Sequence, residues 1–136
     1  MKIIIVILMA TMFAGCSILG YRDVDGLKNN STHAADFVAN RSSGLIYRDF
    51  LRNANARRND PVAGRVAGAN SELDRSSGNA FVTTLHDGRV IGHVEISYRD
   101  SDSAHVRAWW LIGSLYTDCS VRRTADLYLD CPIPKK

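Results

Sequence analysis

The spacing of apolar residues changes along this chain from a helical period to a strand period. Between residues 43 and 58, apolar positions recur three or four apart, which is the spacing of one helical face. They are Ile46, Tyr47, Phe50, Leu51 and Ala54. Ser42 or Ser43 can cap this helix, and Asn59-Asp60-Pro61 should end it, because proline disfavours helix in the preceding residue.

Two shorter helices are predicted on either side of it. Ser31 can cap the first, whose apolar residues are Ala34, Ala35, Phe37 and Val38. The second would follow Pro61, with Val62, Val66, Ala69 and Leu73 on one side. Gly64 and Gly68 weaken that helix by about 1 kcal/mol each relative to alanine. A long loop over residues 61–79 is the alternative.

From residue 80 onward the pattern alternates, which predicts strands. Asp87-Gly88 is a strong signal for a two-residue hairpin turn. A regular register around that turn would pair Leu85 with Val90 and Phe81 with Val94. The more apolar face would then bury four residues together: Phe81, Leu85, Val94 and Ile96. A slip of one residue would reverse the two faces.

A third strand is predicted from Ala104 to Ile112, with Val106, Ala108, Trp110 and Ile112 facing the core. The residues between them then fall on the other face, where Arg107 lies opposite Glu95, Trp109 opposite His93 and Leu111 opposite Ile91. The last apolar segment, from Leu115 to Cys131, reads as a fourth strand or as a short hairpin turning near residues 122–125.

These elements predict an α+β fold in which N-terminal helices pack on a C-terminal antiparallel meander of three to five strands. The chain has 136 residues, a length that suits one domain. We assign that domain to residues 31–136. Residues 17–30 have no sustained period, and we read residues 16–30 as a tether.

The N-terminus has the layout of an export signal. Lys2 is followed by an apolar run from Ile3 to Gly15, which is shorter than the roughly 20 residues that a spanning helix needs. Ala14-Gly15-Cys16 resembles the lipobox of bacterial lipoproteins, although Phe13 stands where that family usually has leucine. A plain secretory signal, ending in the small residues Ala14 and Gly15, is the alternative.

The resemblance to lipoproteins covers only the first 17 residues. It implies that residues 1–15 are a signal peptide cleaved after Gly15, that Cys16 carries a diacylglyceryl thioether, and that the new N-terminus is acylated, as with palmitate. In that family an aspartate after the cysteine favours the inner membrane. Ser17 at this position implies transfer to the outer membrane.

The remaining cysteines predict a disulfide. Cys119 and Cys131 would enter an oxidising compartment, where two leftover cysteines most simply pair. A metal site is the weaker alternative, because no histidine or acidic ligands stand at close spacing around both. The net charge of +3 at pH 7 comes from scattered basic residues, which argues against nucleic-acid binding.

No known catalytic motif is present, and we expect no catalytic residue, cofactor or metal. The sheet face opposite the core is more suggestive, because aromatic and arginine side chains are frequent at binding hot spots. Its candidate partner-binding residues are His93, Arg107, Trp109 and Leu111.

The sequence therefore favours a non-catalytic lipoprotein of the outer membrane that docks a protein partner in the cell envelope. An assembly accessory, an exclusion or immunity factor and an enzyme inhibitor all fit this description. A lipid- or glycan-binding module is the first alternative, and a pocket with convergent polar groups would favour it. An unrecognised periplasmic enzyme is the second, and a cleft holding a histidine and a perturbed carboxylate would favour it.

Overall fold

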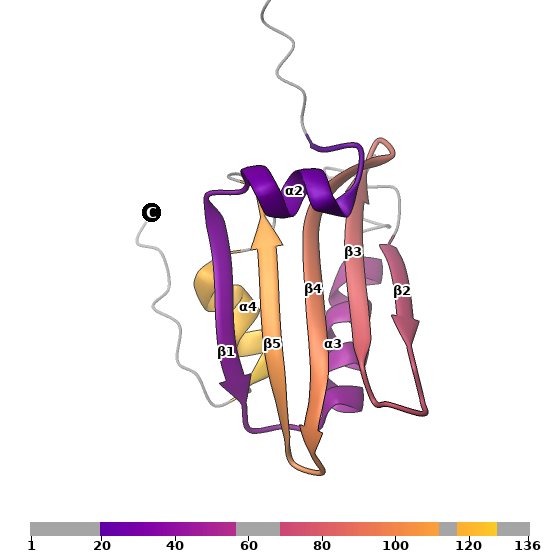
Figure 1. The fold of residues 1–136 in the computed structure, drawn as a ribbon, viewed down its shortest axis with the longest axis vertical. Coiled ribbons are helices and arrows are strands. Elements are labelled where there is room, and N and C mark those ends of the chain that lie inside the picture. Colours follow the sequence, from indigo (N-terminus) through magenta and orange to yellow (C-terminus); the bar gives the residue numbers. More distant parts are fainter. Residues whose placement is uncertain (1–19, 57–68, 112–116, 128–136) are drawn as a thin grey trace, which may run out of the picture.

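The computed structural model describes residues 20–56, 69–111 and 117–127, which form a five-stranded antiparallel sheet and three helices (Figure 1). The strand order is β1-β5-β4-β3-β2. The elements in chain order are α2 (Val24–Asn30), β1 (His33–Ala39), α3 (Ser43–Ala56), β2 (Ala69–Leu73), β3 (Ala80–His86), β4 (Arg89–Asp100), β5 (Ser103–Trp110) and α4 (Asp118–Ala125).

The predicted α+β class is confirmed, but the predicted order of elements is wrong. Helices and strands are interspersed, since β1 precedes α3 and α4 follows the last strand. The first strand in the sequence therefore pairs with the last one, and β1 forms the edge of the sheet beside β5.

The hydrophobic core lies between one face of the sheet and the helices α3 and α4, which Figure 1 shows behind the strands. The helix α2 crosses the upper end of the opposite face. The largest fully buried side chains of the core are Ile46, Phe50, Val82, Val94, Ile96, Val106 and Val121. Burying each aliphatic or aromatic side chain of this size contributes about 1.5–3 kcal/mol.

The helix predicted from its apolar stripe is confirmed as α3. Ile46, Phe50 and Ala54 are buried on one side of it, while Tyr47 packs at the edge of the core. Its predicted end at Asn59-Asp60-Pro61 lies outside the described residues.

The predicted hairpin is also confirmed, but its register is not regular. Asp87 and Gly88 both have positive φ, at 49° and 72°, as a two-residue turn of this kind requires. Leu85 pairs with Val90 as predicted, whereas Thr84 pairs with Gly92, and the shift leaves Ile91 as one extra residue on β4. This β-bulge changes which side chains of β3 face the core.

The bulge makes the predicted core face of β3 wrong. Val82, rather than Phe81, lies opposite Val94 and is fully buried. Phe81 pairs with Glu95 on the opposite face and is only partly buried, and Leu85 is also partly buried. Val94 and Ile96 on β4 do face the core, as predicted.

The predictions for the third strand are confirmed on both faces of β5. Val106, Ala108 and Trp110 are buried in the core, with Trp110 only 5% exposed. On the other face, Arg107 pairs with Glu95 and Trp109 pairs with His93. Ile112 lies outside the described residues.

The short helix predicted after Ser31 is wrong, because those residues form β1. Ala35 and Ala39 point into the core, while Ala34, Asp36 and Val38 are exposed, so the burial alternates as in a strand. A short apolar run fits both periods, and here pairing with β5 over seven residues decides the outcome.

Two further segments differ from the prediction. Ala69 and Leu73, expected on a helix, are the first and last residues of β2, and Val62 and Val66 lie outside the described residues. The predicted last strand or hairpin is instead the helix α4, whose Val121 and Ala125 are fully buried one turn apart.

The predicted tether also contains regular structure. Tyr21 forms an isolated bridge with Val90, and α2 follows, capped by the Asp23 side chain, which accepts a hydrogen bond from the Gly26 N–H at 2.7 Å. Leu27 is fully buried. From Gly20 onward the chain is therefore part of the fold, while residues 16–19 lie outside the described residues.

The lipidation and disulfide predictions concern residues near these limits. Cys16 and Cys131 lie outside the described residues, whereas Cys119 is disulfide-bonded. The pairing of Cys119 with Cys131 stays a prediction. Within the described ranges, none of the helices has the length and apolar character needed to cross a membrane.

Candidate functional site

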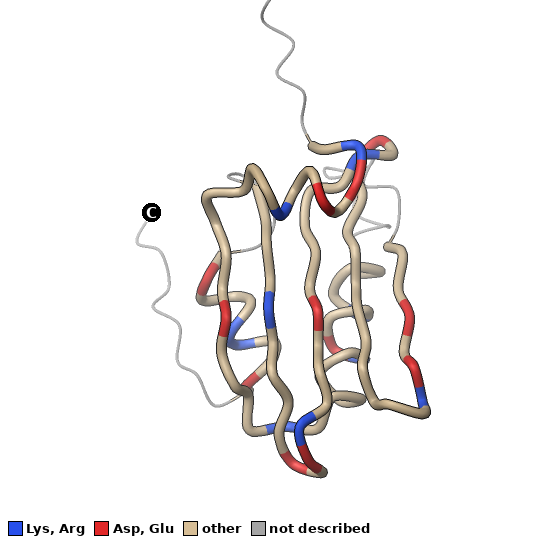
Figure 2. Tube along the Cα trace, viewed as in Figure 1, with Lys and Arg blue, Asp and Glu red and all other residues tan. Residues whose placement is uncertain are grey.

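A groove of about 620 Å³ lies on the sheet face that α3 and α4 leave uncovered. α2 borders it through Val24 and Lys28, and the strands supply its floor. Among the residues that line it are Lys28, Glu72, Phe81, Thr83, His93, Glu95, Ser97 and Arg107. In Figure 2, β2 carries an acidic residue and β5 a basic one, so the groove runs between margins of opposite charge.

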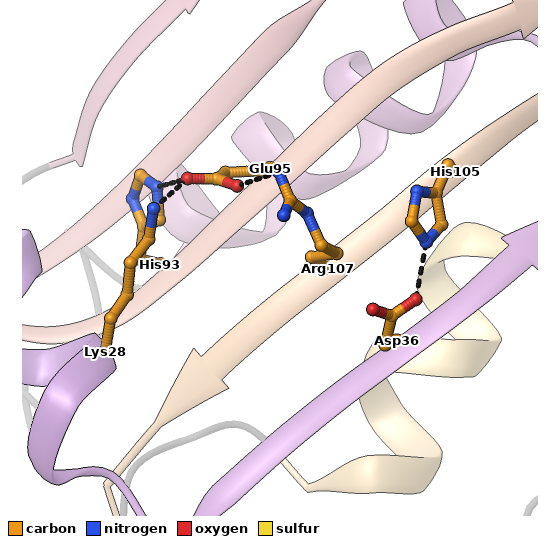
Figure 3. A network of polar contacts seen from close by, with 6 residues as sticks. All are labelled: Lys28, Asp36, His93, Glu95, His105 and Arg107. Carbon is orange, nitrogen blue, oxygen red and sulfur yellow. Dashed lines mark hydrogen bonds and ion pairs between the residues drawn. The ribbon is translucent and has the colours of Figure 1, made fainter.

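Glu95 is the centre of a charge network in this groove (Figure 3). It accepts a hydrogen bond from Lys28, and its other oxygen, Oε2, lies 2.9 Å from Nη2 of Arg107. Burial raises the pKa of Glu95, but the Lys28 hydrogen bond and the positive charges of Lys28 and Arg107 outweigh it and hold that pKa below its usual value. Glu95 is therefore an ionised anchor for two cations, one of which ties α2 to the sheet.

Three side chains surround the imidazole of His93, which is 5% exposed. The Phe81 ring lies 5.9 Å from it and the Trp109 ring 6.1 Å, between centroids. Its Nδ1 is 2.8 Å from Oγ1 of Thr83 on the paired strand. Burial lowers the pKa of His93 and outweighs Glu95, whose charge raises it, so the neutral ring is favoured.

Thr83, His93 and Glu95 are connected in the order hydroxyl, imidazole, carboxylate, as in a nucleophile–base pair held by a third group. Three features argue against catalysis. Nε2 of His93 is 3.4 Å from Glu95 Oε1, which is long for an orienting hydrogen bond. The Thr83 side chain is only 4% exposed and is poorly accessible to a substrate. The charge of Glu95 is neutralised by Lys28 and Arg107. The arrangement holds the rings in place beneath the groove.

The structure brings three of the four predicted binding residues together. Arg107 is exposed at the groove, with 46% of its side-chain surface accessible, while His93 is buried beneath it. Leu111 lies just beyond β5, where its N–H donates to the Ile91 carbonyl at 3.1 Å, and it does not line the groove.

Trp109, another of the predicted binding residues, does not form an exposed apolar patch. Trp109 is partly buried, and Nζ of Lys28 lies 4.7 Å from its ring centroid. His93 stacks on the same side chain, and Cζ of Arg107 is 6.0 Å from its ring centroid. Trp109 therefore supports α2 and the charge network, and the accessible part of the face lies nearer to β3 and β2.

Among the groove residues that sequence reasoning missed are Lys28, Glu72 and Phe81. Lys28 lay in the presumed tether, although Asp23 at the start of α2 is a residue type that favours helix caps. Glu72 lay in a presumed helix or loop. Phe81 was predicted on the core face, and no feature of the sequence indicated the β-bulge that places it on the opposite face.

A separate polar contact between two side chains lies on the same face of the sheet. His105 on β5 contacts Asp36 on β1 through Nε2 and Oδ1, away from the groove (Figure 3). Among residues 20–56, 69–111 and 117–127, no group of three histidine, cysteine or acidic residues is arranged to hold a metal ion.

Comparisons with protein-family models, with curated proteins and with solved structures find no match for this chain. The geometry of the groove and the N-terminal resemblance to lipoproteins thus carry the functional argument.

Proposed function

We propose that this protein is a non-catalytic lipoprotein of the outer membrane, anchored through Cys16, whose sheet face docks a protein partner in the cell envelope. The observation that carries the proposal is the open groove on that face. It combines an exposed arginine with aromatic and charged neighbours, which is the composition typical of interaction hot spots.

Docking is supported by the way in which the polar groups of the groove are used. Glu95 is paired with Lys28 and Arg107, and His93 is hydrogen-bonded to Thr83. A preorganised surface of this kind binds without first having to order its side chains. By contrast, its central carboxylate is ionised and doubly paired and is not free to exchange protons near neutral pH.

Photocrosslinking in the native envelope tests this proposal. A photocrosslinking amino acid placed at Ser97, which lines the groove, should yield a discrete adduct in the membrane fraction after irradiation. The matched control is Asn55 on α3, which is exposed on the other side of the molecule. Adducts of equal yield from both positions, or none from Ser97, would contradict docking on this face.

A lipid or glycan ligand is the second candidate, because polar groups do converge on the groove. Its volume of about 620 Å³ falls within the range of small-molecule pockets, about 300–1,000 Å³. Native mass spectrometry of the protein extracted from membranes in detergent checks this. A bound mass beyond the covalent lipid, lost when Phe81 is replaced by aspartate, would favour the ligand over the protein partner.

A further inference from the structure

One of the two cations that line the groove, Lys28, lies between an aromatic ring and a carboxylate. Lys28 of α2 lies over the ring of Trp109 with its Nζ against the Glu95 carboxylate. A cation placed between an aromatic ring and a carboxylate gains from both the ring quadrupole and the opposite charge. This half of the groove shows that the face can hold a positively charged side chain between an aromatic ring and a carboxylate.

The other half repeats the ring and the carboxylate without a cation. Glu72 on β2 lies directly opposite Phe81 on β3, and Phe81 lies opposite Glu95 on its other side. Directly opposed side chains in antiparallel strands have Cβ atoms about 4.5–5.5 Å apart. The carboxylate of Glu72 is exposed and has no hydrogen bond or ion pair within the part of the chain that the structure describes.

The charges that line the groove are unbalanced in the same direction. Lys28 and Arg107 face three carboxylates, those of Glu72, Asp74 and Glu95. Asp74 is engaged locally, since its oxygens accept hydrogen bonds from the hydroxyls of Ser76 and Ser77 at 2.6 and 2.7 Å. One more positive charge beside Glu72 would neutralise the groove.

We propose that Glu72 and Phe81 form a recognition site for an arginine side chain of the docking partner. The guanidinium stacks on the Phe81 ring and donates to the Glu72 carboxylate. Arginine fits better than lysine here, because its planar group can stack and make two parallel hydrogen bonds to one carboxylate. This inference rests on the proposed docking function and names the side chain that the groove selects.

A titration followed by NMR tests the site in the full-length protein in detergent micelles. The probe is N-acetylarginine amide, and the control is N-acetylcitrulline amide, which has nearly the same shape without the charge. The arginine probe should shift the amide signals of Glu72 and Phe81 in a saturable way, and the citrulline probe should not.

Two variants sharpen the test. Glu72→Gln should weaken probe binding about tenfold, as expected for the loss of a charge-assisted contact. Asp36→Asn removes an acid from the other edge of the same face and should leave binding unchanged, with the remaining spectrum of both variants intact. Equal binding to Glu72→Gln and wild type, or shifts centred elsewhere, would overturn the arginine site.

The failure of this inference is distinguishable from the failure of docking itself. If the probe ignores Glu72 while the Ser97 crosslink persists, the arginine site is refuted and the docking face stands. If the crosslink is absent, the docking proposal fails and the partner's arginine fails with it.

Discussion

Arg41 and Asp49 form an ion pair at 2.7 Å in which both side chains are largely shielded from water, with exposed fractions of 10% and 6%. Arg41 lies just before α3, and its other terminal nitrogen donates to the Thr124 carbonyl of α4 at 3.1 Å. The pair therefore joins the start of α3 to α4 behind the sheet. Burial raises the pKa of Asp49, but the hydrogen bond from Arg41 and the surrounding arginine charges hold it below its usual value.

Removing the carboxylate should destabilise the fold strongly. We expect Asp49→Ala to lower the free energy of unfolding by about 3–5 kcal/mol, because Arg41 is left as an unpaired buried charge. Urea unfolding of the disulfide-intact protein measures this. Arg48→Ala is the control: Arg48 touches the same carboxylate from a position 65% exposed and should change stability by less than about 1 kcal/mol. Similar losses for the two variants would refute a special role of the buried pair.

The two adjacent tryptophans should respond differently to truncation. Trp110→Ala removes a ring buried in the core and should cost about 3–5 kcal/mol of stability. Trp109→Ala should cost less and should act locally, by freeing Lys28 and loosening α2. Hydrogen exchange followed by mass spectrometry, read over residues 24–30, reports this local effect. Equal global losses with unchanged protection of α2 would contradict the assignment.

Stability should fall in mildly acidic solution because of His93. Its folded-state pKa is lowered by burial, so the unfolded chain takes up a proton at pH values where the folded chain does not. The contribution is present above the ordinary histidine pKa of about 6.5 and is lost as the pH falls from there toward the folded-state value. Thermal unfolding between about pH 7.5 and 5 should show a smaller decline for His93→Gln than for wild type. Parallel declines would show that His93 is not the source.

Lipidation is tested at Cys16. The mature protein should carry the mass of a diacylglyceryl thioether and an acyl chain on its first residue, and Cys16→Ser should block lipid attachment. Mass spectrometry of the N-terminal peptide from the membrane fraction measures both. A free Cys16 thiol in the mature protein would refute the lipoprotein assignment.

The sequence predicts those parts of the fold that local chemistry determines. Asp87-Gly88 specifies its turn because both residues must adopt positive φ. The stripe of Ile46, Phe50 and Ala54 specifies α3 because it persists over more than two turns. The pairing of β4 with β5, including His93 opposite Trp109, follows from alternation alone.

The remaining elements depend on contacts that are distant in sequence or on cues that are easily overlooked. Residues 33–39 become a strand because an edge of β5 is free to pair with them. The helix α4 does carry a local cue, a capping box in which Thr117 and Ser120 bond to each other's backbone N–H groups. The candidate site was anticipated in part, because the predicted residue Arg107 does line the groove, whereas Phe81 and Glu72 depend on the bulge and on β2.

Because of the bulge at Ile91, the outer surface of β3 depends on the register of the strand pair as well as on residue identity. A point substitution changes one lining side chain at a time. A regular ladder that paired Ile91 with Thr84 would instead set Phe81 opposite Val94, turning Phe81 inward and Val82 outward. The partner would then meet an inverted strand although no residue had been replaced, so the register at the bulge decides which side chains of β3 line the groove.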